Sequence, residues 1–223
     1  KSSAASDVYK RQGEHIQVQT GFDELDDLTG GLYRGELAVL SGRPSMGKTA
    51  VALHMALRAA RTGRNTLYFS IEMSEEEVTE RILSMLSGVE AGKIRFKGTN
   101  REERVLLEKA AAELAGLPLR IVYCGSLAID EIRAVLMTRK ARRELDVFFI
   151  DYLNLIHIPY TRGSRNETTD LALGDVVRKV KLMAVELDVP AVLLAQMNRD
   201  SDRRLAPYLP ILSDLRNSGA IEQ

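Results

Sequence analysis

The sequence has a single cysteine, three histidines and no long apolar run, although it extends over 223 residues. Cys124 has no second cysteine to pair with, so an internal disulfide is excluded, and we expect a reducing, cytoplasmic setting. The histidines His15, His54 and His157 are scattered and have no cysteine at ligand spacing, which argues against a zinc site. Apolar runs such as Val147–Ile150 are far too short to span a bilayer, so we expect no membrane partner.

The sequence also lacks an excess of either charge. Its 31 Lys and Arg residues balance 31 Asp and Glu residues, which excludes a strongly basic, histone-like binder. If the protein binds nucleic acid, the contact must therefore be a local basic patch. The composition is 45% hydrophobic and 28% charged, which is ordinary for a soluble globular protein and excludes a largely disordered chain.

Residues 1–12 differ from the rest of the chain. They are rich in Ser and Ala, have no apolar period and contain no signal-peptide core. We interpret them as a flexible tail or as an expression or sequencing remnant, and a linker helix to a further domain is the alternative. Residues 13–223 are then expected to form one domain.

Strand-like and helix-like segments alternate from Thr20 onward. The strand-like segments are short and apolar, and they cover residues 36–41, 66–70, 119–123, 146–151 and 189–195. The helical segments cover residues 49–61, 74–86, 101–115, 128–145 and 167–187. The second of these helices opens with Ser74 and Glu77 at the spacing of a capping box. Near-continuous apolar strands that alternate with helices predict an α/β fold, with a mostly parallel sheet and helices on both faces.

A phosphate-binding motif follows the first predicted strand. The pattern G-x-x-x-x-G-K-[ST] is matched by Gly42, Arg43, Pro44, Ser45, Met46, Gly47, Lys48 and Thr49. The glycines allow successive N–H groups to face phosphate oxygens, and the following helix directs its positive end at the same anion. Lys48 supplies a cation for the β- and γ-phosphates, and the Thr49 hydroxyl is a hard oxygen ligand for Mg²⁺. The motif predicts a nucleotide site with Mg²⁺, and an ordinary glycine-rich turn is the alternative.

Three further polar residues lie at the ends of predicted strands, and the carboxyl ends of parallel strands should meet at one edge of the sheet. Asp151 could hold Mg²⁺ against the phosphates, or could be a helix cap or turn residue. Glu72 follows a strand that we expect to neighbour the strand before the phosphate loop. It could polarise the attacking water, or could be a solvated glutamate before a helix. Gln196 could contact the γ-phosphate, or could be a simple polar residue at a strand end.

Six stretches of the sequence, taken together, resemble one family: TGFDELDDLTGGLYRGEL, SGRPSMGKTA, FSIEMS, FFIDYLNLI, LLAQMNR and LSDLRNSGAIEQ. In this order they are similar to the RecA-like motor domain of bacterial replicative DNA helicases, the DnaB family, over about residues 13–223. The resemblance implies a P-loop NTPase that forms a homohexamer around single-stranded DNA. It also implies that ATP with Mg²⁺ drives 5′-to-3′ translocation and unwinding, and that the full-length protein contacts primase and a helicase loader.

The same resemblance assigns roles to individual residues. Lys48 and Thr49 match the family's Walker A pair, and Asp151 matches its Walker B aspartate. Glu72 matches the catalytic glutamate that activates water, and Gln196 matches the glutamine that senses the γ-phosphate.

A DNA-binding loop is implied as well. The segment 216–219 matches the loop that grips DNA phosphates in the ring channel, which implies contacts by Arg216, Asn217 and Gly219. The family usually has an acid where this sequence has Asn217, so the local charge differs here. Arg199 and Arg203 are candidates to line or flank the channel, and ordinary exposed loop arginines are the alternative.

The family's motor domain has features that we do not find in this sequence: further C-terminal strands and an arginine finger, besides a separate N-terminal domain. We therefore expect an open sheet edge, slow ATP hydrolysis and poor unwinding by this chain alone. Two other functions stay open. One is a recombinase-like or clock-type ATPase that nucleotide switches, and the other is a hydrolysis-defective nucleotide-binding module. The LSDLRNSGAIEQ stretch favours the motor over the switch.

Overall fold

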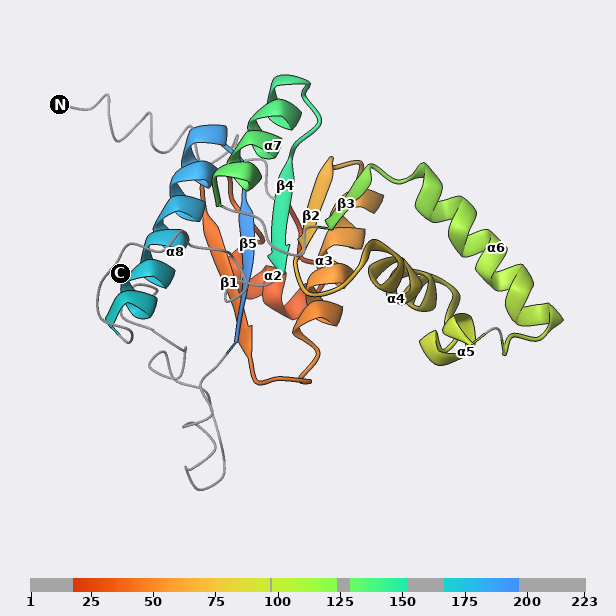
Figure 1. Cartoon of the computed structure of the whole chain (residues 1–223). Helices are drawn as coiled ribbons and strands as arrows, with labels where there is room; N and C mark the ends of the chain where they lie inside the picture. The colour runs from red at the N-terminus through yellow and green to blue at the C-terminus, as the bar shows by residue number, and fades with distance from the viewer. Residues whose placement is uncertain (1–17, 97, 124–128, 152–166, 197–223) are drawn as a thin grey trace.

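The computed structural model describes residues 18–96, 98–123, 129–151 and 167–196, with the backbone alone described for 167–173. Within these residues, five strands form one parallel sheet with helices on both faces (Figure 1). The strands are β1 (Leu37–Gly42), β2 (Thr66–Ser70), β3 (Leu119–Tyr123), β4 (Val147–Asp151) and β5 (Ala191–Gln196). The predicted α/β fold with a parallel sheet is confirmed.

The helices of the described residues connect these strands. They are α2 (Asp23–Thr29), α3 (Lys48–Arg61), α4 (Glu75–Ser87), α5 (Ala91–Arg95), α6 (Arg101–Gly116), α7 (Ile129–Ala141) and α8 (Glu167–Leu187). The helices predicted at 49–61, 74–86, 101–115 and 167–187 are confirmed to within one residue at each end. The helix predicted for 128–145 was too long, because Arg143 adopts a left-handed φ of 60° and the chain turns away after Ala141.

The strand order β1-β5-β4-β2-β3 corrects one prediction. β2 does not neighbour β1, because β5 and β4 lie between them. Every residue of β4 is buried, as is every residue of β5 except the last, whereas the outer strands β1 and β3 are only partly buried. The most apolar strands thus occupy the centre of the sheet. Both of their faces are covered there, so their apolar side chains contribute most to the stability of the fold.

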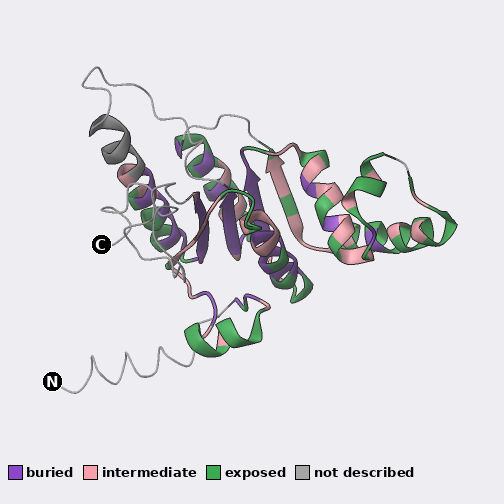
Figure 2. Cartoon of the chain, turned by 90° about the horizontal axis from the view of Figure 1, so that it is seen from below, coloured by how far each residue is buried: buried purple, intermediate pink, exposed green. Residues whose placement is uncertain are grey.

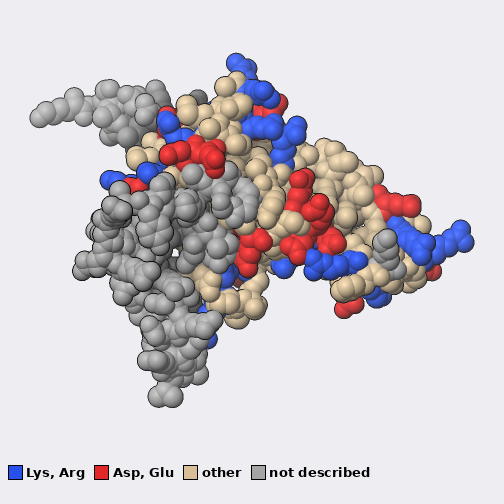
Figure 3. All heavy atoms as spheres, viewed as in Figure 1, with Lys and Arg blue, Asp and Glu red and all other residues tan. Residues whose placement is uncertain are grey.

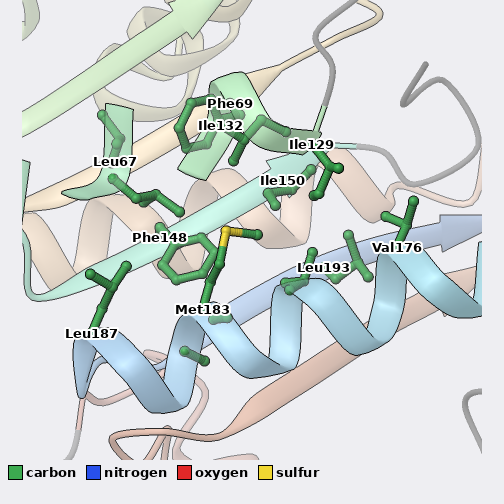
Figure 4. Close-up of a cluster of buried hydrophobic side chains, with 14 of the residues drawn as sticks. Leu67, Phe69, Ile129, Ile132, Phe148, Ile150, Val176, Met183, Leu187 and Leu193 are labelled. Atoms are coloured by element: carbon green, nitrogen blue, oxygen red, sulfur yellow. The ribbon is translucent and has the colours of Figure 1, made fainter. Parts of the chain in front are cut away.

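Each face of the sheet carries its own apolar core. On one face, α7 and α8 pack on alternate residues of the strands, including Phe69, Phe148 and Leu193 (Figure 4). On the other face, α3 and α4 pack on the intervening residues, including Tyr68 and Phe149. Figure 2 shows the buried strands between the two helical layers. The side chains of Asp151 and Gln196 therefore belong to the face that α3 covers, because they continue the alternation of β4 and β5.

A lobe made of α4, α5 and α6 extends from the sheet (Figure 1). The predicted capping box opens α4: the Ser74 hydroxyl accepts from the Glu77 N–H, and the Glu77 carboxylate accepts from the Ser74 N–H. A second capping box, which was not predicted, opens α6 at Asn100 and Glu103. The first box fixes the start of α4 directly after the segment that carries Glu72.

Charged side chains of both signs are interspersed over the described surface, with acidic ones gathered over α4 in the view of Figure 3. This mixture agrees with the zero net charge of the sequence. Within the described ranges, no helix is both long enough and apolar enough to cross a membrane.

Candidate nucleotide site at the carboxyl edge of the sheet

The predicted phosphate loop joins the end of β1 to the start of α3. Gly42 is the last residue of β1, and α3 begins at Lys48, so the loop lies directly between a strand and a helix as the motif requires. Gly47 adopts a φ of 84° at the N-cap of α3, a left-handed conformation that favours glycine. A Cβ on Gly42 would come within 3.2 Å of Lys48 Cγ, so a side chain there would crowd the lysine. The motif thus needs its two glycines for different reasons: Gly47 for its left-handed backbone, and Gly42 for the space that the Lys48 side chain occupies.

Lys48 folds back over the loop that precedes it. Its ammonium donates to the carbonyl oxygens of Gly42 at 3.0 Å and Arg43 at 2.9 Å. Partial burial lowers the pKa of Lys48 below its ordinary value, while the negative charges of Asp151 and Glu72 act to raise it. Both carboxylates are therefore close enough to Lys48 to act on its charge, although they come from two different strand ends.

We use the term carboxyl edge for the strand ends Gly42, Gln196, Asp151 and Ser70, together with Glu72. The parallel pairing sets Gly42 of β1 opposite Gln196 of β5. It likewise sets Ser70 of β2 opposite Asp151 of β4. The predicted meeting of these strand ends at one edge is confirmed, even though the predicted neighbour of β2 was wrong.

Glu72 lies in a short turn between β2 and α4. The Ser70 hydroxyl donates to the Met73 carbonyl oxygen at 2.6 Å, and the Ile71 N–H donates to the Asp151 carbonyl oxygen at 2.8 Å. Ile71 is buried, whereas Glu72 is exposed. The turn is thus held at both ends and presents the Glu72 carboxylate to solvent beside the phosphate loop.

Asp151 is buried at the end of β4, with 6% of its surface exposed. Its Oδ2 accepts a 2.8 Å hydrogen bond from the Tyr68 hydroxyl. Burial raises the pKa of Tyr68 well above its ordinary value, and the charge of Asp151 adds to this, so the phenol stays protonated and donates. Sequence reasoning missed Tyr68 and Ser70. A signal was available, because Tyr68 and Ser70 are two residues apart on β2 and therefore share a face. Using it to find a contact with Asp151 required knowing that β2 pairs with β4.

The donor set at this edge fits Mg²⁺. The ion prefers hard oxygen ligands and is commonly held by one or two carboxylates together with substrate phosphates. The Asp151 carboxylate and the Thr49 hydroxyl, in the first turn of α3, supply such oxygens. In the part of the chain that the structure describes, no group of three or more His, Cys, Asp or Glu side chains could hold a metal by itself. A cation shared between these two oxygens and a nucleotide matches this donor set.

Other predicted site residues are not among those that the structure describes. Arg199, Arg203, Arg216, Asn217 and Gly219 are outside the described residues, as is the segment 1–12. A mostly apolar cavity of about 370 Å³ lies between α2 and the middle of β1, lined by residues such as Leu25 and Val39. Its lining does not include the phosphate loop, so it is separate from the carboxyl edge.

A parallel sheet with a glycine-rich loop between β1 and α3, and with acidic groups at neighbouring strand ends, defines a P-loop NTPase of the RecA-like class. Comparison with known families narrows this class. The sequence model of the DnaB-like helicase C-terminal domain matches residues 17–223, and the chain belongs to this family. The resemblance found in the sequence is confirmed.

Curated relatives agree with this assignment. Replicative DNA helicase DnaB of Leifsonia xyli subsp. xyli is 36% identical over 214 residues, which cover 96% of this chain and 46% of the relative. Replicative DNA helicase DnaB of Geobacillus stearothermophilus is 34% identical over 217 residues, which cover 97% of this chain and 47% of the relative. The chain thus spans about half the length of the curated relatives it matches.

Solved structures share the fold. A DnaB-like replicative helicase, determined in a study of its interactions with primase, superposes with a TM-score of 0.88 at 28% identity. The match covers 100% of this chain and 54% of that structure's chain. A second solved structure, that of an ATPase domain, superposes with a TM-score of 0.87 at 29% identity and covers 99% of this chain and 79% of that one.

Proposed function

We propose that this chain is the motor domain of a replicative DNA helicase, which hydrolyses ATP with Mg²⁺ to move along single-stranded DNA and unwind duplex. Family membership and the similarity to a solved replicative helicase and to a solved ATPase domain support the proposal. The observation that carries it is geometric: the phosphate loop between β1 and α3 lies at the same edge of the parallel sheet as Asp151 and the turn that carries Glu72. A cation and two carboxylates beside a phosphate loop are the groups that phosphoryl transfer to water requires.

In this proposal the loop Gly42–Thr49 holds the triphosphate. Backbone N–H groups of the loop and the start of α3 bind phosphate oxygens, and Lys48 exchanges its bonds to the loop carbonyls for the β- and γ-phosphates. Asp151 and Thr49 hold Mg²⁺, which when bound neutralises charge on the phosphates.

Glu72 is the proposed general base. It is exposed at the tip of a turn that Ser70 and Ile71 hold against β4, so its carboxylate can accept a proton from a water near the γ-phosphate. Gln196, opposite Gly42, is the proposed sensor of the γ-phosphate, since an amide can donate to the phosphate and accept from a neighbouring loop.

DNA and partner contacts belong to the same proposal. Arg216, with the backbone at Asn217 and Gly219, would bind DNA phosphates, and Arg199 and Arg203 would flank the channel. Six weak contacts of this kind in a homohexamer would gain by multivalency. The solved structure that was studied with primase supports primase as a partner of the full-length protein, and a helicase loader is a further partner that we propose from the family resemblance alone.

The test measures ATP turnover with and without single-stranded DNA, together with binding of a fluorescent ATP analogue. Glu72→Gln should lower turnover by about 100-fold, in the range of a lost general base, and should leave nucleotide affinity unchanged. Glu75→Gln, an exposed glutamate in the first turn of α4, is the matched control and should behave as the wild type.

Stimulation of turnover by DNA that depends on Glu72 supports a motor. Hydrolysis without DNA stimulation favours a nucleotide-switched ATPase. Nucleotide binding without any hydrolysis favours a binding module. Equal turnover by Glu72→Gln and the wild type would remove Glu72 from the catalytic role.

A further inference from the structure

Tyr68 reaches the carboxyl edge although it belongs to none of the predicted motifs. It lies in the middle of β2 and is fully buried. Its ring stacks on Phe149 of β4, with centroids 5.9 Å apart and an interplanar angle of 21°. Its hydroxyl donates the 2.8 Å hydrogen bond to Asp151 Oδ2. The side chain therefore connects the interior of one strand to the end of its neighbour.

The register of the two strands explains this reach. Tyr68 lies opposite Phe149, and Ser70 lies opposite Asp151, so Tyr68 and Asp151 are diagonal neighbours on the face that α3 covers. An aromatic side chain is long enough to span a diagonal on a sheet. The Phe149 ring holds the Tyr68 ring in place, so the direction of the hydroxyl is fixed by packing.

The hydrogen bond matters because the Asp151 carboxylate is buried. A buried carboxylate is costly unless hydrogen bonds or a cation compensate the lost water. The hydrogen bond from the Tyr68 hydroxyl replaces a bond that Oδ2 would make to water, and it restrains rotation of the carboxylate about its Cβ–Cγ bond. Oδ1 is thereby held in one direction. Loss of a partner that orients a metal ligand commonly lowers metal affinity or activity by about 10- to 100-fold.

We propose that Tyr68 is a positioning residue for Asp151: its hydroxyl fixes the carboxylate that, under the proposed function, holds Mg²⁺ beside the nucleotide phosphates. Tyr68 touches neither nucleotide nor metal in this account and acts through Asp151 alone. Its loss should therefore weaken only that part of nucleotide binding that depends on Mg²⁺.

The test is Tyr68→Phe, which removes the hydroxyl and keeps the ring that stacks on Phe149. Affinity for a fluorescent, non-hydrolysable ATP analogue is measured in Mg²⁺ and in EDTA, at a temperature below the unfolding midpoint of each variant. We expect affinity in Mg²⁺ to fall by about tenfold, as for other lost partners of metal ligands. Affinity in EDTA should stay at the wild-type value.

Three further variants isolate the interaction. Asp151→Asn keeps an oxygen that accepts from Tyr68 but removes the charge, so it should lose the Mg²⁺ dependence. Adding Tyr68→Phe to Asp151→Asn should not lower the affinity in Mg²⁺ any further, because the carboxylate through which Tyr68 acts has already been removed. Tyr123→Phe, which alters the tyrosine opposite Ser70 at the exposed end of β3, is the matched control and should bind as the wild type.

Equal affinity of Tyr68→Phe and the wild type in Mg²⁺ overturns the positioning role. A loss of the same size in EDTA also overturns it, because it would reflect packing of the loop and not orientation of Asp151. If the wild-type protein binds nucleotide no better in Mg²⁺ than in EDTA, the proposed function itself fails, and this is seen before any variant is compared.

Discussion

The Ser70 hydroxyl donates a 2.6 Å hydrogen bond to the carbonyl oxygen of Met73, which closes the turn that carries Glu72. Ser70 is the last residue of β2 and is buried, so the bond joins the sheet to the turn that precedes α4. The position of the proposed general base therefore depends on the side chain at the end of β2.

Ser70→Ala should loosen this turn. The lost hydrogen bond should reduce the free energy of unfolding by about 1 kcal/mol. Turnover of ATP should fall by about tenfold, because displacing a general base by a fraction of an ångström is costly, whereas nucleotide affinity should not change. The measurement is steady-state ATP hydrolysis together with binding of an ATP analogue.

Ser84→Ala is the control for this prediction. The Ser84 hydroxyl also donates a 2.6 Å bond to a backbone carbonyl, that of Val89, but it lies in the second half of α4. It should lose similar stability and keep full turnover. A Ser70→Ala variant whose turnover equals that of Ser84→Ala would contradict the role assigned to the turn.

The start of α6 should be sensitive to a single substitution. The Asn100 side chain accepts from the Glu103 N–H at 2.8 Å, and the Glu103 carboxylate accepts from the Asn100 N–H at 2.9 Å. Asn100→Ala removes the side-chain half of this capping box and should cost about 1 kcal/mol of unfolding free energy. Chemical denaturation measures the loss. Thr99→Ala, one residue earlier, should have a much smaller effect, and equal losses would count against the cap.

Acid should weaken the contact between α5 and α6. Hydrogen bonding and the charge of Lys93, 2.6 Å from Glu103, lower the pKa of the glutamate, and the same bond raises the pKa of the lysine. A lowered carboxyl pKa means that the contact stabilises the fold above the ordinary glutamate pKa of 4.5. That contribution is lost as the pH falls through the lowered value.

Glu103→Gln tests this pH dependence, because glutamine still accepts the Asn100 hydrogen bond but carries no charge. The variant should unfold at a slightly lower temperature than the wild type at neutral pH, and the difference should disappear in acid and in high salt. A difference that persists unchanged in acid would show that the charge of Glu103 is not responsible.

Much of the fold follows from the sequence because the signals are local. Apolar strands such as β2 and β4, and the Ser74–Glu77 capping box, carry their information within a few residues. The short helices α2 and α5 were missed. α2 begins after Phe22 with no side-chain cap, and α5 has five residues, which are too few to show a helical period.

The order of the strands could not be predicted in the same way. Which strands become neighbours depends on how the helices cross the sheet and on which strands bury both faces, and these are properties of the whole domain. For this reason the phosphate loop and Asp151 could be identified from residue type and position. The Tyr68–Asp151 bond could not, because it exists only if β2 and β4 are adjacent.

Titration of Mg·ATP into the wild-type chain and into Lys48→Ala, followed by calorimetry, tests the central claim most directly: one nucleotide is held at residues 42–49. We expect one nucleotide per wild-type chain and an affinity lower by about 100-fold in Lys48→Ala, since a charge-assisted contact to phosphate contributes about 3 kcal/mol. Equal affinities in the two proteins, or no binding by the wild type, would contradict the assignment of the phosphate loop and the account built on it.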